Sequence, residues 1–399
     1  MRRQALLLGL VTVLGCSGSA DPSDPTTTDA DVDTGTEVDS ATADAGDSSP
    51  SETSTPVDTG TVDAPTDTPV EAGKPEVRFV GRFDTTDPAG PKFEWSGSQI
   101  IARFTGTAVR VKLKANKDIQ FAVTIDGGAP TLLKPTGASG TYTLATGLAA
   151  GSHDVVLWRR TEAFFNDAQF LGFEFDGGGL QAPPPAPAKR IEVIGDSISA
   201  GYGNEGTIAT CSFSSDTENH FLSYEALAAR AKGADLVSTP WSGIGMYRSY
   251  DGSTTDQMPI LYERTLPTIA TSKWDFAKFA PDAVVINLGT NDFAKGDPGT
   301  PFRDAYLKFV RRVRSAYPKA WIFPALGSML SGTELDQARK YLQAVIATLN
   351  GEGDTRVSLL EFATQLSSDG YGCDYHPNKT THGKMAKVLG DALTAKLGW

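Results

Sequence analysis

The sequence predicts two folded domains, an antiparallel β sandwich followed by an α/β domain with a parallel sheet. The first observation is that residues 75–182 contain short runs in which apolar and polar residues alternate. The second is that apolar strand-like runs alternate with helical stretches in residues 189–399. The third is the proline-rich segment 183–188, which can continue neither a helix nor a central strand. We therefore place a hinge between the two domains in this segment.

The first 15 residues are predicted to be an export signal. Arg2 and Arg3 precede an apolar run that starts at Ala5 and is about ten residues long, half of what a membrane-spanning helix needs. The run ends in Val-Leu-Gly-Cys, which resembles the lipobox of bacterial lipoproteins. That resemblance implies cleavage before Cys16, lipid on its sulfur and an anchor in the cell envelope, at the outer membrane or cell surface. The alternative is an ordinary signal peptide with an incidental cysteine.

Residues 16–74 are predicted to be a disordered acidic linker. Within them, residues 17–73 hold 14 of the 48 acidic side chains of the chain and none of its 36 basic ones. The segment has too little apolar surface to offset the entropy of folding. With Arg2 and Arg3 also set aside, the rest of the chain carries 34 acidic and 34 basic side chains, so the net charge of −12 arises at the N-terminus. A nucleic-acid-binding protein would show a basic stripe, and we exclude that class.

The sandwich is predicted from period-2 runs with turn residues between them. These runs are Ile100–Phe104, Val109–Leu113, Phe121–Ile125 and Val155–Trp158. Glycine and aspartate separate them, as in Asp126-Gly127-Gly128. Runs and turns at this spacing are typical of an antiparallel sandwich, and we expect no helix of three turns before residue 182.

The α/β domain is predicted from strands that alternate with helices. Strands are expected at Arg190–Ile194, Leu236–Val237, Val284–Leu288, Trp321–Phe323 and Val357–Leu360. Helices are expected over residues 219–232, 301–317, 334–350 and 382–397. This alternation predicts a parallel sheet that is covered on both faces. In such a fold the functional site lies beyond the carboxyl ends of the strands.

Three of the predicted strand ends carry residues that chemistry could use. Ser197 follows the first strand, where it could present its hydroxyl beside free amides or merely cap a short helix. Gly243 follows the second, where its amide could approach a ligand or simply form a turn. Asn291 follows the third, where its side-chain amide could donate to an oxyanion or belong to a polar turn.

One of the four histidines is expected at the same edge of the sheet. His376 lies in the loop between the last strand and the last helix, and Asp374 stands two residues before it. The other three are expected to have no part in chemistry. His153 is predicted to lie in a solvated turn, His220 to be structural, and His382 to be exposed on the last helix.

Taken in order, Ser197, Gly243, Asn291 and His376 resemble the four blocks of the SGNH hydrolases of the GDSL type. This resemblance implies a three-layer, flavodoxin-like α/β domain over residues 189–399. It implies that Ser197 is the nucleophile and His376 its base. It also implies an oxyanion hole made by the amides of Ser197 and Gly243 with the side chain of Asn291.

A narrower resemblance covers nearly everything from residue 75 onward. The sandwich, the Gly195-Asp196-Ser197 block and Asp374-Tyr375-His376-Pro377-Asn378 are together similar to carbohydrate esterase family 2. Members of that family pair a jelly-roll domain with an SGNH domain and remove acetyl groups from plant polysaccharides. The resemblance implies that Asp374 orients His376. The general SGNH pattern places the acid one residue earlier, where this chain has Cys373, and a main-chain carbonyl could orient the ring instead.

The expected activity is that of an extracellular carbohydrate O-acetyl esterase that works through an acyl-enzyme. The expected partners are acetylated polysaccharides or oligosaccharides, and a membrane only through the lipid anchor. No metal or other cofactor is implied. Two alternatives stay open: an SGNH esterase such as a lysophospholipase that acts on other acyl esters, and a non-catalytic glycan-binding surface lipoprotein.

The two cysteines other than Cys16 are predicted to form a disulfide. Lipidation of Cys16 leaves two thiols, an even number, in a chain exported to an oxidising compartment. A bond between Cys211 and Cys373 would join the loop after Ser197 to the loop that carries His376. The alternative is two buried, unpaired thiols.

Overall fold

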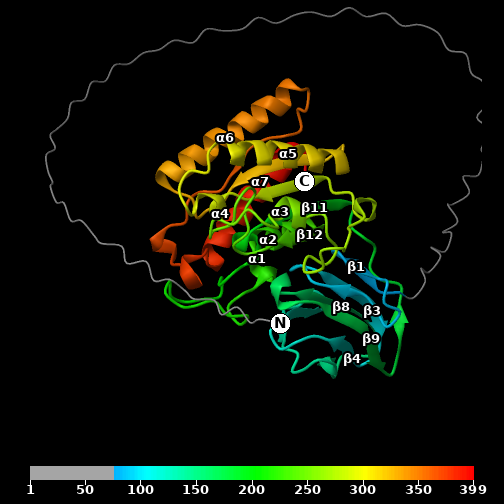
Figure 1. Cartoon of the computed structure of the whole chain (residues 1–399). Coiled ribbons are helices and arrows are strands. Elements are labelled where there is room, and N and C mark those ends of the chain that lie inside the picture. The colour runs from blue at the N-terminus through cyan, green and yellow to red at the C-terminus, as the bar shows by residue number, and fades with distance from the viewer. Residues whose placement is uncertain (1–75) are drawn as a thin grey trace, which may run out of the picture. The chain divides into compact units, whose positions relative to one another are not determined.

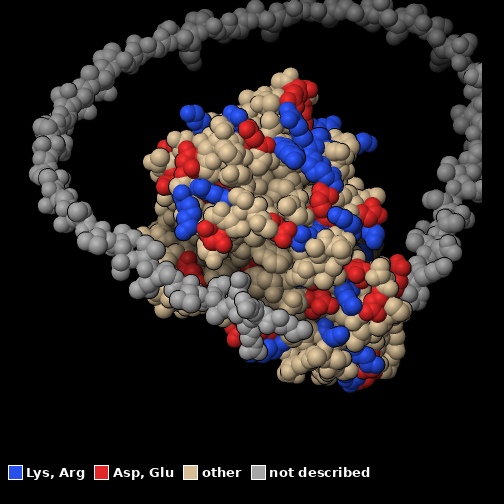
Figure 2. Space-filling model, viewed as in Figure 1, with Lys and Arg blue, Asp and Glu red and all other residues tan. Residues whose placement is uncertain are grey.

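The computed structural model describes residues 76–399, which belong to one compact unit (Figure 1). The predicted export signal, Cys16 and the acidic linker lie outside the described residues. Within residues 76–399 no helix combines the length and the apolar character needed to cross a bilayer. Basic and acidic side chains are interspersed over the face of the molecule in Figure 2.

Residues 78–181 form a sandwich of two antiparallel sheets, as predicted. The first sheet has the strand order β1-β3-β8-β5-β6, with β10 also paired to β3. Its strands are β1 (Arg78–Val80), β3 (Gln99–Thr105), β5 (Phe121–Ile125), β6 (Thr131–Leu133), β8 (Ser152–Arg159) and β10 (Leu180–Gln181). The second sheet has the order β2-β9-β4-β7 and consists of β2 (Lys92–Phe93), β4 (Ala108–Lys114), β7 (Gly140–Thr146) and β9 (Ala168–Asp176). Apolar side chains from both sheets form one buried cluster that includes Phe104, Val111 and Leu157.

The second part is built on a five-stranded parallel sheet with the order β12-β11-β13-β14-β15. Its strands are β11 (Lys189–Gly195), β12 (Ala234–Pro240), β13 (Ala283–Asn287), β14 (Trp321–Leu326) and β15 (Leu360–Glu361). Of the strands in this sheet, β11 comes first in the chain, and it lies between β12 and β13, which come second and third. A flavodoxin-like sheet has its crevice at this point, beyond the carboxyl end of that strand.

Helices cover both faces of this sheet, which confirms the expected fold class. The long helices are α2 (Tyr224–Lys232), α5 (Thr300–Ala316), α6 (Gly332–Gly351) and α7 (Lys379–Leu397), and the short ones are α1 (Ser197–Ala200), α3 (Met258–Leu261) and α4 (Thr290–Phe293). Single 3₁₀ turns occur at η1 (Ala163–Phe165), η2 (His220–Leu222), η3 (Phe276–Lys278), η4 (Ser367–Asp369) and η5 (Cys373–Tyr375).

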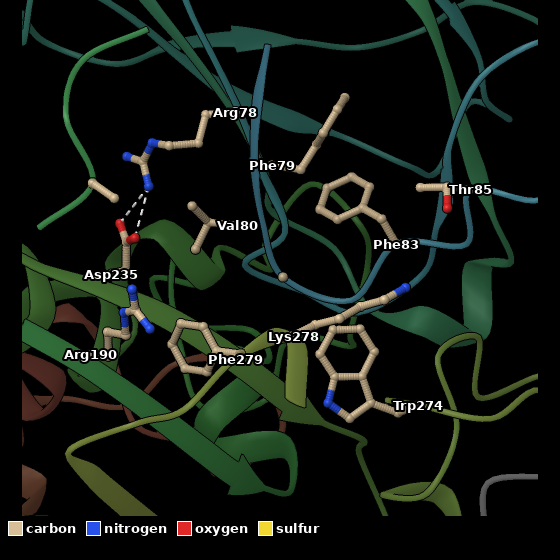
Figure 3. Close-up of a pocket in the computed structure, with 12 residues that line it drawn as sticks. Arg78, Phe79, Val80, Phe83, Thr85, Arg190, Asp235, Trp274, Lys278 and Phe279 are labelled. Atoms are coloured by element: carbon tan, nitrogen blue, oxygen red, sulfur yellow. Dashed lines mark hydrogen bonds and ion pairs between the residues drawn. The ribbon is translucent and has the colours of Figure 1, made fainter. Parts of the chain in front are cut away.

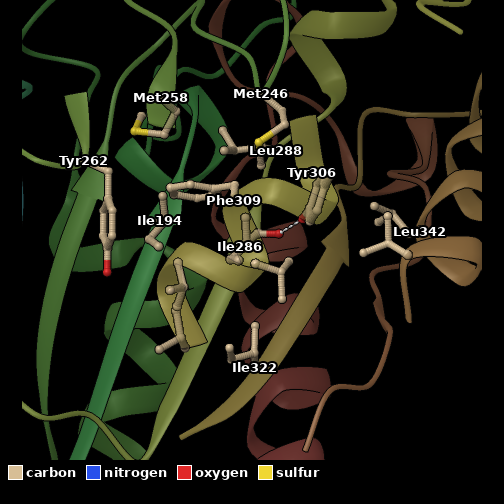
Figure 4. Packing of buried hydrophobic residues seen from close by; sticks show 14 of the residues in the cluster. Ile194, Met246, Met258, Tyr262, Ile286, Leu288, Tyr306, Phe309, Ile322 and Leu342 are labelled. Atoms are coloured by element: carbon tan, nitrogen blue, oxygen red, sulfur yellow. Dashed lines mark hydrogen bonds between the residues drawn. The ribbon is translucent and has the colours of Figure 1, made fainter. Parts of the chain in front are cut away.

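Strand residues alternate between two cores, as the period of a strand requires. Ile194 and Ile286 point to the cluster that contains Phe309 of α5 (Figure 4). Val193 and Val285, their neighbours in the sequence, point to the opposite cluster, which includes residues of α2 and α7. Both faces of the sheet are therefore buried.

Two predicted elements differ from the structure. The helix expected over residues 219–232 is divided at Ser223, whose extended backbone and side chain cap α2. Because a capping serine has non-helical dihedral angles, one continuous helix is excluded there. The strand expected at Val357–Leu360 is reduced to a bridge between Val357 and Ile322, followed by the two residues of β15.

The sandwich packs against the α/β part through buried polar contacts. Arg82 is fully buried, and its guanidinium donates to Glu192 of β11 at 2.9 Å. Arg78 of β1 donates to both oxygens of Asp235 in β12, at 2.7 and 3.0 Å (Figure 3). A cavity of about 420 Å³ adjoins the pair of Arg78 and Asp235. Because Asp235 is near the start of its strand, this cavity lies at the edge of the sheet opposite to Ser197.

Candidate active site

Ser197 is the first residue of α1 and follows directly on the end of β11. Asp196 caps the helix, since its Oδ1 atom accepts the N–H of Ile198 at 3.0 Å. Gly195 permits the sharp turn, because an added Cβ there would overlap the Ser199 side chain. The serine side chain is 6% exposed. The strand end and the helix cap thus hold Ser197 in one position at the top of the sheet.

His376 is in hydrogen-bond contact with this serine. Its Nε2 atom lies 2.9 Å from Ser197 Oγ, and its Nδ1 atom lies 3.1 Å from the main-chain oxygen of Asp374. A carbonyl oxygen can only accept, so Nδ1 must carry the proton and Nε2 presents its lone pair to the serine hydroxyl. This is the arrangement of a nucleophile with an oriented base.

The environment of His376 keeps its imidazole neutral. The ring packs on Tyr202, with 4.2 Å between the ring centroids. Desolvation lowers the pKa of His376 from 6.5 to about 4, and the hydrogen bond to the Asp374 carbonyl only partly opposes this shift. The base is therefore unprotonated and ready to accept a proton at neutral pH.

The carboxylate of Asp374 faces away from the histidine ring. Its Oδ2 atom accepts the Tyr202 hydroxyl at 2.8 Å and the Phe213 N–H at 3.0 Å. The backbone at Asp374 and Tyr375 has φ values of 51° and 59°, in the left-handed region. Of the two ways to orient His376 that the sequence leaves open, the structure has the main-chain carbonyl, while the carboxylate supports the ring that packs on the histidine.

A disulfide fixes the loop that carries His376. Cys211 and Cys373 are bonded, with 4.6 Å between their Cα atoms, so the structure contains the predicted bridge. Backbone hydrogen bonds reinforce it, from Cys373 N to Gly203 O at 3.0 Å and from Asp374 N to Cys211 O at 2.9 Å. Gly206 allows this close approach, because an added Cβ would lie 2.5 Å from Cys373 Sγ. The loop after the nucleophile and the histidine loop are therefore joined.

The three expected oxyanion donors follow three adjacent strands of the parallel sheet, β12, β11 and β13. The side-chain Nδ2 of Asn291, at the start of α4, is 2.9 Å from the Ile244 carbonyl and 3.5 Å from Asp196 Oδ2. Gly243 has a φ of 79°, which favours glycine, and its loop follows β12. No acceptor within residues 76–399 takes the N–H of Ser197 or of Gly243. Two backbone donors are thus available for an oxygen that bears negative charge.

Asp292, which the sequence reasoning did not single out, holds the loop that contains Gly243. Its carboxylate accepts the N–H groups of Met246, Tyr247 and Arg248 at 2.8, 2.7 and 2.9 Å. Burial raises the pKa of Asp292 to about 6, although these three hydrogen bonds oppose the shift. The carboxylate thus fixes the far end of the loop that contains Gly243. Its place next to Asn291 was the one signal in the sequence.

Glu162 was missed as well, and it comes from the sandwich. Its carboxylate accepts both the N–H of Ser242, at 2.7 Å, and the hydroxyl of the same serine. Nothing in the sequence links these residues, which are 80 positions apart.

Two exposed tyrosines border the site. Tyr375 is 56% exposed and directly precedes His376, and Tyr250 is 52% exposed. The Tyr250 ring lies against Gly243, so that a side chain on the glycine would collide with it. Both rings are accessible to a ligand that binds at the site, and aromatic side chains commonly line such sites.

The other histidines lie away from the nucleophile. His220 is buried and accepts a hydrogen bond from Trp158 Nε1 at 3.1 Å, in agreement with a structural role. His153 bonds Asp126 at 2.7 Å, and its side chain is only 11% exposed, less than expected. The prediction for His382 was wrong, because this residue is fully buried. It faces α2, where its Nδ1 atom accepts the N–H of Tyr224 at 3.1 Å.

Comparison with known families gives two matches. The family of the carbohydrate esterase 2 N-terminal domain matches residues 79–185, and the GDSL-like lipase/acylhydrolase family matches residues 193–384. The first match ends within the proline-rich segment, and the second begins shortly after it and includes Ser197, Gly243, Asn291 and His376.

Individual relatives agree. The chain is 43% identical over 326 residues to the cellulase/esterase CelE of Acetivibrio thermocellus, of which it spans 40% of the length. It is 27% identical to an acetylxylan esterase/glucomannan deacetylase of Cellvibrio japonicus, over 83% of this chain and 91% of the relative. The solved family two carbohydrate esterase from Clostridium thermocellum in complex with cellohexaose has a TM-score of 0.78 and 43% identity, over 81% of this chain and 100% of that one. The chain therefore belongs to carbohydrate esterase family 2 and is a serine carboxylic ester hydrolase.

Proposed function

We propose that this carbohydrate esterase removes O-acetyl groups from polysaccharides through an acetyl-enzyme on Ser197. The observation that carries the proposal is the 2.9 Å contact between Ser197 Oγ and His376 Nε2. The tautomer of the His376 ring is set by the Asp374 carbonyl, which lies 3.1 Å from Nδ1. The relatives named acetylxylan esterase/glucomannan deacetylase support the choice of acetyl esters and of polysaccharides.

In the first half of the reaction Ser197 Oγ attacks the acetyl carbonyl carbon while His376 Nε2 takes the hydroxyl proton. The carbonyl π electrons move to its oxygen, which becomes an oxyanion. The tetrahedral intermediate then expels the sugar oxygen, and that oxygen takes the proton from Nε2. The products of this half are a free sugar hydroxyl and an acetyl ester on Ser197.

In the second half, water replaces the sugar. His376 takes a proton from the water as the water oxygen attacks the acetyl ester. The intermediate expels Ser197 Oγ, which recovers the proton from His376, and the product leaves as acetic acid, which ionises to acetate in solution.

The N–H groups of Ser197 and Gly243 and the Asn291 amide would hold the oxyanion in both halves. These donors are already fixed before substrate binds, Gly243 through its loop and Asn291 through its bond to the Ile244 carbonyl. Donors that need no reorganisation stabilise the transition state more than they stabilise the neutral carbonyl.

The proposal is tested by acetate release from acetylated xylan and acetylated glucomannan, with Ser197→Ala as the control. We expect release by the wild type and a loss of about 10³-fold or more in the variant. Release of long-chain fatty acid from lysophospholipid in preference to acetate would assign the chain to the other acyl esterases. Binding of glycan with no release from any ester would make it a binding protein.

We also propose that the protein is exported and anchored to the cell envelope through lipid on Cys16. The basic start, the apolar run and the Val-Leu-Gly-Cys sequence support this, and so does a disulfide, which persists in oxidising compartments. Cells supplied with labelled fatty acid should label the wild type, whereas Cys16→Ser should stay unlabelled and retain esterase activity. Failure of the wild type to take up label would refute the anchor.

A further inference from the structure

The oxyanion loop has a neighbour that belongs to the sandwich domain. Glu162 lies between β8 and η1 and is fully buried. One of its carboxylate oxygens accepts the N–H of Ser242 at 2.7 Å, and the other accepts the Ser242 hydroxyl. Ser242 is thus held at two points, immediately before the peptide unit whose N–H belongs to Gly243.

The turn that carries Glu162 is itself rigid. Its own N–H donates to the carboxylate of Glu218 at 3.1 Å. The buried guanidinium of Arg159 donates to the carbonyl of Glu162 at 2.9 Å and to that of Phe93 at 2.9 Å. The carboxylate therefore meets Ser242 from a fixed direction.

The loop has a carboxylate at each end. At its start, Glu162 of the sandwich fixes Ser242, and at its far end Asp292 of the α/β part accepts three N–H groups. Gly243 lies between these two anchors. Because glycine is the residue with the most backbone freedom, the direction of its N–H depends on the restraints around it.

A second buried carboxyl group lies beside Glu162. Burial raises the pKa of Glu162 and, more strongly, that of Glu218. The hydrogen bonds from Ser242 oppose the shift at Glu162 and so favour its charged form.

We propose that Glu162 is a positioning residue for the oxyanion hole, acting through Ser242 on the N–H of Gly243. By this inference the sandwich domain contributes to catalysis in addition to packing against the α/β part. The inference rests on the proposed serine mechanism and goes beyond it, because it assigns a role in turnover to a residue outside the α/β part.

The first test compares two substitutions at the same position by steady-state kinetics on an aryl acetate. Glu162→Ala removes both hydrogen bonds, and we expect kcat to fall about 10- to 100-fold with KM changed less than twofold, since the oxyanion forms only in the transition state. Glu162→Gln can accept the Ser242 N–H and donate to its hydroxyl, and we expect kcat within about threefold of the wild type.

Asp235→Ala is the matched control. It also removes a carboxylate that crosses the same interface, from the Arg78 pair at the opposite edge of the sheet. We expect it to lower the melting temperature and to leave kcat unchanged. A loss of kcat in Asp235→Ala equal to that in Glu162→Ala would overturn the proposal, because both losses would then come from a weakened interface.

The second readout is inhibition by phenylboronic acid, which adds to a serine hydroxyl to give a tetrahedral anion. Its inhibition constant should rise in Glu162→Ala by the factor by which kcat/KM falls, and should be unchanged in Asp235→Ala. If Glu162→Ala does not fold, Ser242→Ala removes only the hydroxyl contact and should show a smaller loss of the same kind.

A folded Glu162→Ala, or in its place Ser242→Ala, with wild-type kcat and inhibition would overturn the inference. Ser197→Ala separates this result from a failure of the proposed function. If Ser197→Ala is inactive and the Glu162 and Ser242 variants are unaffected, the serine mechanism stands and the positioning role fails.

Discussion

The Nδ1 atom of His376 lies 3.1 Å from the carbonyl oxygen of Asp374, while the carboxylate of this aspartate is bonded to Tyr202 and to the Phe213 amide. A carbonyl sets the imidazole tautomer as well as a carboxylate does. It carries no full charge, so it stabilises the imidazolium less. The residue at position 374 thus acts on the histidine mainly through its backbone.

Asp374→Asn should therefore be a mild variant. Asparagine tolerates the left-handed backbone at this position and can still accept the Tyr202 hydroxyl. We expect kcat on an aryl acetate to fall less than about tenfold, against about 10³-fold or more for Ser197→Ala. An Asp374→Asn variant as inactive as Ser197→Ala, with an unchanged circular dichroism spectrum, would show that the carboxylate is essential.

Asn291→Ala should lower kcat and leave the fold intact. The side-chain amide would donate to the oxyanion, and loss of one such donor typically costs about 10²–10³ in turnover. Its remaining contacts are the Ile244 carbonyl and the more distant Asp196. Steady-state kinetics measured beside thermal unfolding check this, and a variant with at least half of wild-type kcat would remove Asn291 from the oxyanion hole.

The acid limb of the pH profile should lie well below the value for an ordinary histidine. Because desolvation lowers the pKa of His376 to about 4, the base is neutral above that pH. We expect kcat/KM to be constant down to about pH 5 and to fall as the pH drops through 4. A limb centred near 6.5, measured with an uncharged substrate, would contradict the desolvation of the His376 ring.

The same shift predicts how stability depends on pH. His376 and His382 have folded-state pKa values of about 4 and about 3, below the unfolded value of 6.5. The unfolded chain therefore binds more protons below pH 6.5, and these two groups reduce the free energy of unfolding as the pH falls from 6.5 toward 4. His382→Gln should weaken this dependence in denaturant titrations at pH 5 and pH 7. If the free energy of unfolding differed between pH 5 and pH 7 by the same amount in His382→Gln as in the wild type, the burial of His382 would be contradicted.

Reduction of the Cys211–Cys373 disulfide should destabilise the protein and its site together. The bond closes a loop with a sequence separation of 162, for which chain entropy alone allows up to roughly 5 kcal/mol. We expect Cys211→Ser/Cys373→Ser to melt at a lower temperature and to lose kcat, because the histidine loop is no longer fixed against the loop after Ser197. Reductant should lower the melting temperature of the wild type and not that of the double variant.

Tyr375→Ala should affect large substrates and spare small ones. The exposed ring beside His376 offers a flat apolar face on which a sugar ring can pack. We expect KM for acetylated polysaccharide to rise severalfold, with kinetics on an aryl acetate unchanged. Equal effects on both substrates would indicate that the tyrosine supports the loop and does not bind sugar.

The site residues that could be predicted from the sequence to lie at one edge of the sheet are those whose position follows from the topology of the sheet. Ser197, Gly243 and Asn291 each follow a strand of one parallel sheet, so their strands bring them to one edge whatever the details of the loops. The pairing of Cys211 with Cys373 followed from the count of cysteines. The pattern along the strands was equally informative, because alternating runs indicate strands with one buried face, as in the sandwich, and continuous apolar runs indicate strands buried on both faces, as in β13.

The contacts that escaped prediction depend on conformation or on packing between distant segments. The Asp374 carboxylate is directed away from His376 in a loop where Asp374 and Tyr375 both have left-handed backbone angles. An Asp-Tyr sequence does not predict this conformation. The contact between Glu162 and Ser242 joins two domains without any shared period. His382 was misplaced because α7 begins at Lys379, so that His382 lies inside the helix, on the face that packs against α2.

The buried pair of Arg82 and Glu192 sets a limit on how such a chain can be cut or recombined. Glu192 lies in the middle of β11, without any solvent exposure, and accepts from Arg82 of the sandwich at 2.9 Å and from Tyr262 at 3.0 Å. A fragment that began at residue 189 would lose the counter-charge of this carboxylate, and loss of one partner from a buried ion pair typically costs about 3–5 kcal/mol. Exchange of the sandwich for an unrelated module would remove the same partner. The proline-rich segment thus separates two units of sequence that a buried charge pair joins.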